Sequence, residues 1–439
     1  MSDREGEHSF EPISGRKWFL GYFLSNLAGG ITSPLIPMYV LIYLHSNVFY
    51  VGLTSALVSA AGVPFLIFWG NISDRLGLRK VFILLGFLGG GVSLLGIAFA
   101  NSVLIYIAVL AVFQIVIMAS VPVSTMIIIE NTSRESWPNM MSTFSMVSSA
   151  GTVLGLSIGT LAILTMPENP YYLVYLYIIS ALIYISAGIA VSVLIPEPER
   201  NIPRGSLFNI YSVRIIERIR YIPSNIIHII GEKGTEDRSL TVEMWAFLIS
   251  CAILMFAFQM FFVPFPAYMI ESRKVSDTII YLMYLGNSAM GAITYRFSGR
   301  AVNSYGPNRI LLMSIVIRTV IFSIVASVAI GLDFYSYTVL VLVILYSVLG
   351  GVWSLISISQ LSVISNGIRP SVRGRAIGYY NSLTGSGQIA AAVVAGYLSL
   401  VVGYGITFTL SAILVVLAAI ITLRSVSVIL IRKKKTASS

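Results

Sequence analysis

The stretch that decides the fold is residues 70–80, Gly-Asn-Ile-Ser-Asp-Arg-Leu-Gly-Leu-Arg-Lys, which separates two long apolar runs. Gly70 allows a helix end to pack closely on a neighbour, and Gly77 permits a turn that other residues resist. Asp74 is an anion that can face the positive N-terminus of a helix. Basic residues in such a loop mark the cytoplasmic side of a membrane, and this loop has Arg75, Arg79 and Lys80. The pattern therefore predicts a short cytoplasmic loop between two membrane-spanning helices.

The composition around this loop is that of a multi-pass membrane protein. Of the 439 residues, 56% are hydrophobic and 10% are charged, whereas a soluble domain carries about 25% charged residues. The mean hydropathy is +0.87. The first apolar run, 18–44, is too long for the core of a cleavable signal peptide, so we expect it to remain as a helix. The chain has one cysteine, Cys251, and therefore no internal disulfide.

The placement of the basic residues and of the histidines argues against a nucleic acid and a metal ion as ligands. The net charge is +10, but the basic residues are spread over short loops and do not form a nucleic-acid-binding patch. The histidines lie in tails or loops and cannot form a metal site without distant carboxylates; they are His8, His45 and His228. We therefore expect no metal, no cofactor and no nucleic-acid partner.

Twelve apolar runs predict twelve membrane-spanning helices, each long enough to cross a hydrocarbon core of about 30 Å. An even number of crossings places both termini on one side. The loops on that side are rich in arginine and lysine, whereas the opposite loops hold only Arg273 and Lys274. Both termini are therefore expected to be cytoplasmic. The predicted helices are 17–44, 50–73, 79–99, 103–130, 138–165, 171–195, 242–270, 276–298, 308–331, 334–365, 374–402 and 404–424.

One long polar stretch, 196–241, divides these helices into two groups of six. Its middle, 207–222, mixes isoleucine and valine with arginine, which fits either an amphipathic helix on the inner leaflet or a plain basic linker. The predicted organisation is a cytoplasmic tail (1–16), an N-terminal bundle (17–195), the cytoplasmic central loop (196–241), a C-terminal bundle (242–424) and a basic cytoplasmic tail (425–439).

The two groups of helices carry matching sequence. Residues 299–309, Gly-Arg-Ala-Val-Asn-Ser-Tyr-Gly-Pro-Asn-Arg, are a degraded copy of the motif at 70–80. A second match relates 139–151 to 375–387, where both helices enter with a Ser/Asn pattern that ends in glycine. Two matches at corresponding places indicate an internal duplication.

With twelve helices, a central loop, the motif and its copy, the chain resembles transporters of the major facilitator superfamily (MFS). The resemblance implies an all-α membrane protein with the MFS fold, in which two pseudo-symmetric six-helix bundles surround a cavity that opens alternately to each side. It also implies that Glu130, at the end of helix 4, pairs with Arg75 or Arg79 in a gate. The residues to which the resemblance gives a gating role are Gly70, Asp74, Arg75, Gly77, Arg79, Lys80 and Glu130.

In this family, helices 1, 4, 7 and 10 line the cavity and helices 2, 5, 8 and 11 flank it. Polar side chains are costly in lipid and usually turn inward, although some serve only as hydrogen-bond partners between helices. Several aromatic residues can stack on a solute or pack the core: Trp353, Tyr39, Tyr268, Tyr284 and Phe261. The polar stripe of helix 11 holds Asn381, Thr384 and Gln388. The candidate substrate-binding residues are Asn26, Gln114, Gln259, Asn287, Trp353, Gln360 and Asn381.

The middle third of every predicted helix lacks Asp, Glu and Lys. Arg318 in helix 9 is the one deep cation, and we interpret it as snorkelling to the interface, because helix 9 is a supporting helix in the family. A substrate with a phosphate or several carboxylates generally needs a cation in the cavity, so we expect a small neutral or hydrophobic solute. The acidic residues lie at helix ends, and the sequence leaves coupling to a proton or another cation open.

These observations predict a secondary transporter, not an enzyme, that works by alternating access. Helix 5 lacks the Gly-Pro typical of drug/proton antiporters, so drug-type efflux and nutrient uptake are both retained. A sensor or receptor on the transporter fold is the alternative, and a membrane enzyme would need a nucleophile with a base, or a metal cluster, at membrane depth. The expected partners are a small-molecule substrate and the lipid bilayer. The expected state is a monomer in the plasma membrane.

Overall fold

The structure is a computed structural model, and it describes residues 15–76, 78–131, 137–165, 170–195, 240–331, 337–368 and 373–437. Within these ranges the chain forms helices joined by short turns, with no strand. The predicted all-α class is therefore confirmed. The predicted amphipathic segment at 207–222 lies outside the described residues, and so does Gly77.

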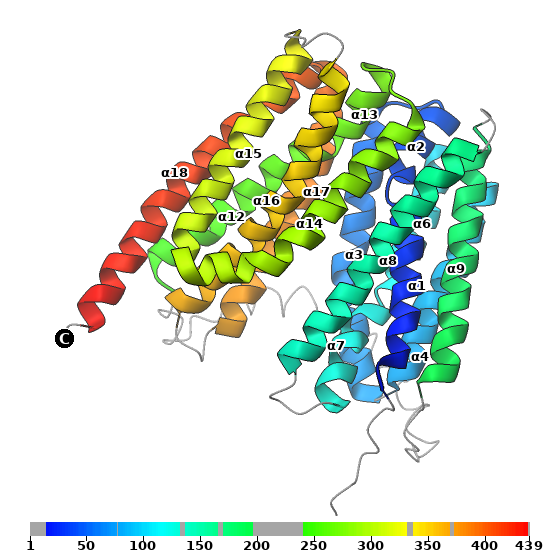
Figure 1. Cartoon of the computed structure of the whole chain (residues 1–439), viewed down its shortest axis with the longest axis horizontal. Helices are drawn as coiled ribbons and strands as arrows, with labels where there is room; N and C mark the ends of the chain where they lie inside the picture. The colour runs from blue at the N-terminus through cyan, green and yellow to red at the C-terminus, as the bar shows by residue number, and fades with distance from the viewer. Residues whose placement is uncertain are drawn as a thin grey trace, which may run out of the picture.

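The first half of the chain folds into six helical crossings, three of which are built from more than one helix (Figure 1). Prolines at 34 and 37 interrupt the first crossing, because proline lacks the N–H that a continuing helix needs. In chain order after η1 (Gly15–Trp18), the elements are α1 (Phe19–Thr32), α2 (Leu35–Met38), η2 (Tyr39–Tyr43), α3 (Val48–Leu76), α4 (Arg79–Leu84), η3 (Leu85–Gly89), α5 (Gly90–Leu95), η4 (Gly96–Phe99), α6 (Val103–Ile117), α7 (Ser120–Asn131), α8 (Trp137–Thr165) and α9 (Tyr172–Leu194).

The second half forms the other six crossings. Its last helix continues to Ala437, past the end predicted at 424. After Arg424 the sequence is again mostly apolar as far as Ile431, and backbone hydrogen bonds within a helix need no apolar surroundings, so the helix extends through this stretch into the basic tail. The elements are α12 (Val242–Phe262), α13 (Pro264–Glu271), α14 (Asp277–Tyr305), α15 (Pro307–Ile330), α16 (Thr338–Gly367), α17 (Arg373–Val401) and α18 (Tyr404–Ala437).

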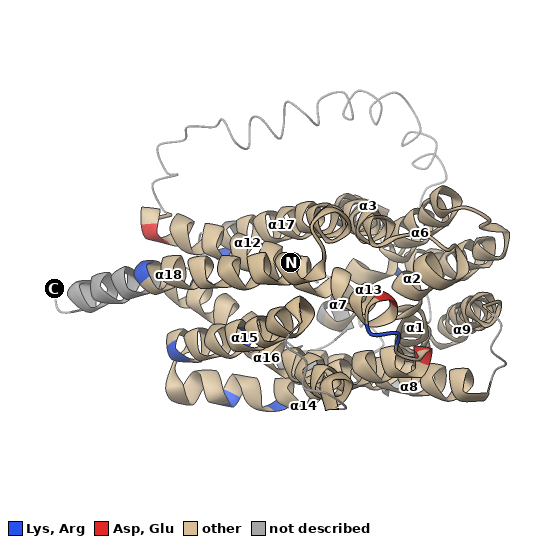
Figure 2. Ribbon diagram, turned by 90° about the horizontal axis from the view of Figure 1, so that it is seen from above, with Lys and Arg blue, Asp and Glu red and all other residues tan. Residues whose placement is uncertain are grey.

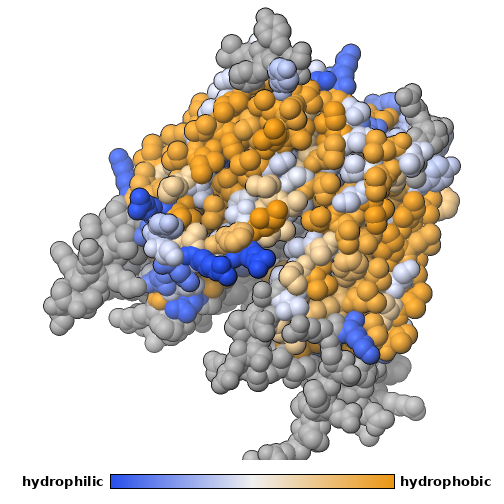
Figure 3. Space-filling view, in the orientation of Figure 1, coloured by the Kyte–Doolittle hydropathy of each residue, from blue (hydrophilic) through white to orange (hydrophobic). Residues whose placement is uncertain are grey.

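The helices have the length and surface of membrane spans. In the described part of the chain, 11 helical segments are long and apolar enough to cross a membrane. The remaining crossing, α14, has 29 residues and is more polar. Charged residues are sparse on the described ribbon (Figure 2), and apolar side chains cover most of the face drawn in Figure 3. Helices with internal backbone hydrogen bonds and an apolar exterior are what a bilayer requires, so this is a multi-pass membrane protein.

The two halves repeat one packing arrangement. In the first half α8 packs on α1, and in the second half α17 packs on α12. A Cβ atom added to Gly151 would lie 2.4 Å from the carbonyl oxygen of Phe23, and one added to Gly387 would lie 2.8 Å from that of Ala252. Each glycine lets the fifth crossing of its half touch the backbone of the first crossing. These two glycines end the second pair of matching segments in the sequence.

The halves are joined at one end of the molecule and diverge toward the other (Figure 1). We call the end at which α1 begins and α18 ends the terminal face, and the other end the opposite face. The contacts between halves are made chiefly by α3 with α17 and by α8 with α14. The helices of the two halves therefore separate toward the terminal face.

Candidate functional site

The opposite face is closed where α3 meets α17. A Cβ atom on Gly52 would lie 2.4 Å from the carbonyl oxygen of Ala392, and one on Gly396 would lie 3.0 Å from that of Phe49. The two backbones therefore touch at a pair of glycines, one from each half. A larger side chain at either position would separate the helices.

Tyrosines make the second closing contact. The hydroxyl of Tyr281 on α14 donates a hydrogen bond to the carbonyl oxygen of Ile31 on α1, at 2.7 Å. The Tyr281 ring also fills the space beside Gly159 of α8, where an added Cβ atom would lie 2.2 Å from it. Nearer the rim, the hydroxyl of Tyr172 on α9 donates to the carboxylate of Asp277 on α14. Each of these contacts ties one half to the other.

A cavity of about 310 Å³ lies between the halves, beside the closed contact. We call it the central cavity. Its walls come from both halves, through the first and second crossings on one side and the seventh, eighth, tenth and eleventh on the other. The residues that line it are Ser33, Ile36, Pro37, Val51, Ser55, Val58, Ser59, Gln259, Phe262, Val263, Pro266, Tyr284, Tyr346, Gln388 and Ala392.

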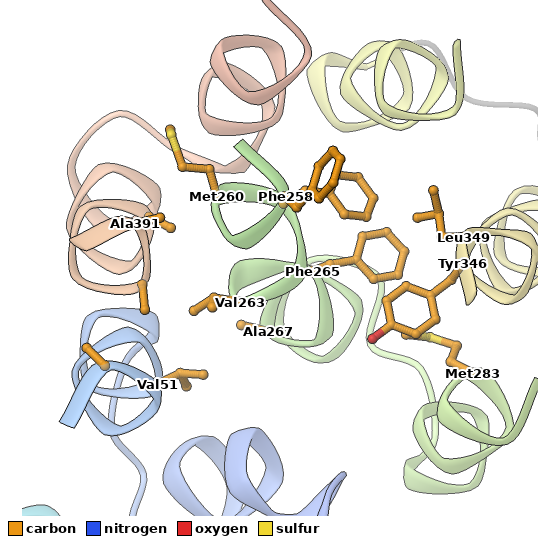
Figure 4. Close-up of a cluster of buried hydrophobic side chains, with 14 of the residues drawn as sticks. Val51, Phe258, Met260, Val263, Phe265, Ala267, Met283, Tyr346, Leu349 and Ala391 are labelled. Atoms are coloured by element: carbon orange, nitrogen blue, oxygen red, sulfur yellow. The ribbon is translucent and has the colours of Figure 1, made fainter. Parts of the chain in front are cut away.

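The lining offers hydrogen bonds and ring faces, and none of its residues carries a charge. Gln259 and Gln388 each present an amide, which can both donate and accept hydrogen bonds. The Phe262 and Tyr346 rings pack edge to face at 5.5 Å between centroids. Tyr346 also stacks on Phe265 at 5.1 Å, and Figure 4 shows these two rings side by side in the core behind the cavity. This set of groups suits an uncharged ring that bears hydroxyl, carbonyl or amide groups.

A second cavity, of about 210 Å³, adjoins the first and lies within the N-terminal half. We call it the side cavity. It shares Ser33, Ile36 and Val58 with the central cavity, so these three residues lie between the two spaces. Its other lining residues are mostly apolar or aromatic: Gly29, Thr32, Leu94, Leu110, Phe113, Gln114, Ile117, Tyr177 and Tyr184.

Two of the predicted binding residues line a cavity. Gln259 lines the central cavity and Gln114 lines the side cavity. Gln388, on the predicted stripe of helix 11, also lines the central cavity, as does Tyr284. The structure therefore brings together the amides of the seventh and eleventh crossings.

The other five predicted residues lie elsewhere, outside the residues that line either cavity. The Nδ2 atom of Asn26 donates to the carbonyl oxygen of Tyr22 in its own helix at 2.8 Å. Asn287 donates to the carbonyl oxygen of Tyr346 at 2.8 Å and so links α14 to α16. Gln360 is buried and accepts a hydrogen bond from Tyr380 at 2.8 Å.

Trp353 packs edge-on against Phe258, at 6.3 Å between ring centroids, and Asn381 is exposed.

Sequence reasoning missed Tyr346, because it stands in an apolar run with nothing to distinguish it from core tyrosines. It also missed Ser55 and Ser59, although their spacing of four residues places them on one face of α3.

The interpretation of Arg318 as a snorkelling residue is wrong. Its side chain is 1% exposed and lies with its guanidinium carbon 4.0 Å from the centre of the Phe258 ring. Its Nη2 atom donates to the carbonyl oxygen of Leu349 at 3.0 Å. The side chain therefore points into the C-terminal half, toward α12 and α16, and not to the membrane interface.

The predicted gating motif lies at the terminal-face end of α3 and the start of α4. A Cβ atom added to Gly70 would lie 3.7 Å from the side chain of Pro122 on α7. The Nη1 atom of Arg79 donates to the hydroxyl of Ser73 at 2.8 Å, across the loop. Gly306, the counterpart of Gly77 in the second copy, ends α14 with φ +84°, a conformation that favours glycine. Outside the described residues lie Gly77 and the side chains of Asp74, Arg75 and Glu130.

The fold is shared with solved transporter structures. A variant of the nucleoside transporter NupG is similar with a TM-score of 0.73 and 14% identity, over 93% of this chain and 98% of that one. A bacterial homologue of the human lysosomal transporter Spinster, inward-facing and unoccupied, has a TM-score of 0.67 and 13% identity, over 94% and 96%. The inward-open xylose transporter XylE from E. coli has a TM-score of 0.65 and 12% identity, over 92% and 95%.

At these identities the likeness concerns the fold, and the sequence itself gives the family. No curated protein matches the sequence. The family model of the Major Facilitator Superfamily matches residues 18–392 and 247–438, which together extend from the first crossing to the last. This chain belongs to the Major Facilitator Superfamily.

Proposed function

We propose that the chain is a carrier that moves a small uncharged or hydrophobic organic solute by alternating access. The observation that supports this most is the central cavity, which lies between the halves, is closed at the opposite face and is lined by amides, hydroxyls and rings without charge. Its volume of about 310 Å³ lies at the lower end of the range for small-molecule sites, about 300–1,000 Å³. A phosphate or dicarboxylate placed there would lack a matching cation, at a cost of several kcal/mol.

Two of the similar structures support the same class of solute. One is a nucleoside transporter and another a D-xylose–proton symporter, and nucleosides and sugars combine rings with hydroxyl groups. We therefore propose that Gln259 and Gln388 hydrogen-bond the solute while Tyr284, Tyr346 and Phe262 contact its ring. The side cavity gives room for a longer or more apolar solute.

We also propose the orientation and state of the carrier. The terminal face is taken as cytoplasmic, because Arg79, Lys80, Arg296, Arg300 and Arg309 lie in loops or helix ends of that side. The structure then corresponds to an inward-facing state. The chain acts as a monomer in the plasma membrane, and the direction of net transport follows from the solute gradient or from coupling to a proton or cation.

A thermal-shift screen of the purified full chain tests the proposed solute class. A ligand at 100 times its Kd that binds only the folded state adds about 2.7 kcal/mol of stability. We expect stabilisation by a member of a panel of uncharged nucleosides, sugars and hydrophobic drugs, and none by their phosphorylated forms. Stabilisation by phosphorylated or dicarboxylate compounds alone would overturn the proposal.

A matched set of variants then tests the site. The double variant Gln259→Ala, Gln388→Ala should lower the affinity for the stabilising ligand by about fivefold or more, since each lost hydrogen bond costs about 0.5–1.5 kcal/mol. Asn381→Ala removes an exposed amide from the same helix as Gln388 and should leave affinity unchanged. Flux of the ligand into proteoliposomes separates a carrier from a sensor, which would bind the ligand without moving it.

A further inference from the structure

The strongest unexplained feature of the molecule is the burial of Arg318. It lies at the middle of α15, eleven residues after Pro307 and twelve before Ile330. Its side chain is 1% exposed. The guanidinium carbon lies 4.0 Å from the centre of the Phe258 ring and 5.6 Å from that of Phe262. A permanent charge therefore sits at mid-depth in an aromatic niche.

The hydrogen bonding of this guanidinium is incomplete. A guanidinium carries five N–H donors in one plane and stays charged in proteins. Nη2 donates to the carbonyl oxygen of Leu349 at 3.0 Å, but Nε and Nη1 have no hydrogen-bond partner in the described structure. Buried donors without partners are costly, and more so when the group is charged. The aromatic niche therefore holds a cation, and two of the three nitrogens of this guanidinium have no hydrogen-bond acceptor among the described residues.

The chain itself cannot supply a counter-charge at this depth. The sequence contains no Asp or Glu in 244–270, 278–332 or 334–439, which include α15, α16 and all of α12 except its first turn, where Glu243 lies. The aromatic rings attract the cation, but they offer no lone pair to the free N–H groups. An anion that entered the niche would supply the acceptors that Nε and Nη1 lack in the described structure.

The niche lies directly behind the wall of the central cavity. Phe262 lines the cavity and also contacts Arg318. The Trp353 ring lies 5.9 Å from the guanidinium carbon and is only partly buried, although it does not line the cavity. Phe262 therefore stands between Arg318 and the cavity.

We propose that Arg318 is an anion-binding site that takes one carboxylate-type group from the central cavity, with Phe262 as its movable cover. A planar oxoanion matches the guanidinium fork by two parallel hydrogen bonds. One cation balances one negative charge, so the site selects a monoanion. The group can belong to a free small anion or to a solute. The proposal shares the central cavity and Phe262 with the solute site proposed above and adds Arg318 to it, so loss of the acetate response in Arg318→Gln is separable from loss of solute affinity in the Gln259→Ala, Gln388→Ala variant.

Acetate is the probe for this site, and acetamide is its neutral control of the same shape. The melting temperature of the purified full chain is followed while acetate replaces the bulky anion morpholinoethanesulfonate at constant ionic strength and pH 7.5. We expect a saturable rise with acetate and none with acetamide. Arg318→Gln should weaken the apparent acetate affinity at least tenfold.

Arg273→Gln is the matched control variant. Arg273 also lies over a ring, that of Tyr268 at 5.4 Å, and donates to the carbonyl oxygen of Val328 at 2.9 Å, but it is at the opposite face. This variant should keep the full acetate response. A shift that is equal in wild type and Arg318→Gln, or no saturable shift in wild type, would overturn the proposal.

Two further measurements keep the test decisive if Arg318→Gln folds poorly. Arg318→Lys keeps the charge but loses the fork, and should retain a weaker response. Trp353 fluorescence, obtained by subtracting the spectrum of Trp353→Phe, should change with acetate and with the same midpoint as the melting temperature. An unchanged Trp353 signal at saturating acetate would place the anion elsewhere and overturn the proposal.

Benzoate distinguishes the two sources of the anion. If the carboxylate belongs to a solute, the benzoate ring gains contacts in the cavity and benzoate should bind at least tenfold tighter than acetate, with both responses lost in Arg318→Gln. If the site takes a free small anion, acetate should bind at least as tightly as benzoate.

Discussion

The two faces of the molecule are held by different kinds of residue. The opposite face is closed by backbone contact at Gly52 and Gly396, by the Tyr281 hydroxyl and by one carboxylate, Asp277. The terminal face carries the charged motif at 70–80, and there the halves diverge. Packing contacts act only over a few ångströms, whereas charges act over longer distances. The face marked by a sequence motif is thus not the face that holds this state together.

This difference predicts effects of opposite sign. Changes at the opposite face should shift the balance away from the state seen here, and changes in the motif should shift it toward this state. A single cysteine introduced at Ser55, in the central cavity, can report how often the opposite face is open. An impermeant maleimide added at that face labels the cysteine only while the face is open. The native Cys251 is 1% exposed, so its background should be low.

Gly52→Leu should have the largest effect. The added side chain has no room against Ala392, and overpacking of this kind costs about 1–3 kcal/mol. We expect transport to fall about tenfold or more and labelling at position 55 from the opposite face to rise. Gly299→Ala is the control, because an added Cβ atom there meets nothing within 4 Å. Normal transport by a well-folded Gly52→Leu protein would show that this contact does not close the face.

Asp277→Asn should have the next largest effect. The amide can still accept from Tyr172, but the bond loses its charge assistance, a difference of about 1–2 kcal/mol. Labelling from the opposite face should rise several-fold. Glu271→Gln is the control, because Glu271 accepts from Tyr404 within the C-terminal half and does not join the halves. Equal labelling of the two variants would argue against a latch at Asp277.

Tyr281→Phe removes one hydroxyl and keeps the ring that fills the space beside Gly159. The lost hydrogen bond to Ile31 should cost the closed face about 0.5–1.5 kcal/mol, a two- to tenfold change in labelling. Tyr305→Phe, near the other end of the same helix and 65% exposed, should change nothing. The idea fails if Tyr281→Phe labels like wild type.

Asp74→Asn should have the smallest effect, and of the other sign. The gating role that the motif gives to Asp74 is to stabilise the state in which the terminal face is closed. Its negative charge near a helix N-terminus would stabilise that state by about 0.3–1 kcal/mol. Labelling from the opposite face should fall and transport should drop while folding is kept. Combined with Asp277→Asn, it should bring labelling back toward the wild-type value. A rise in labelling would reverse the assignment of this motif to the terminal-face gate.

The number and order of the crossings could be predicted because each is a long apolar run and each loop is marked by charge. The π-helical segment at Leu85–Gly89 and the break after Ile117 could not. They depend on distant partners: Gly86 packs on Ser120, and the hydroxyl of Tyr22 donates to the carbonyl oxygen of Ser120, 98 residues away. Such contacts leave no local pattern in the sequence.

In the candidate site, too, features with a local sequence pattern could be predicted and features set by distant contacts could not. Gln259 and Gln114 could be found because an amide in an apolar run is costly unless it faces other polar groups. The direction in which Arg318 points could not be found, because it is set by Phe258, which lies 60 residues earlier and belongs to a different helix. The five predicted residues outside the cavities show that polarity in a span marks an inward direction but not a ligand.

The close approach of Gly52 and Gly396 has a mechanical consequence. The contact lies near one end of α3, and the helix continues to Leu76. At 1.5 Å per residue this is a lever arm of roughly 36 Å, so a tilt of about 10° at the contact would move the far end by about 6 Å. Because the Gly52–Gly396 contact lies close to the opposite face, a small tilt of α3 at this contact opens the terminal face wide enough for a solute.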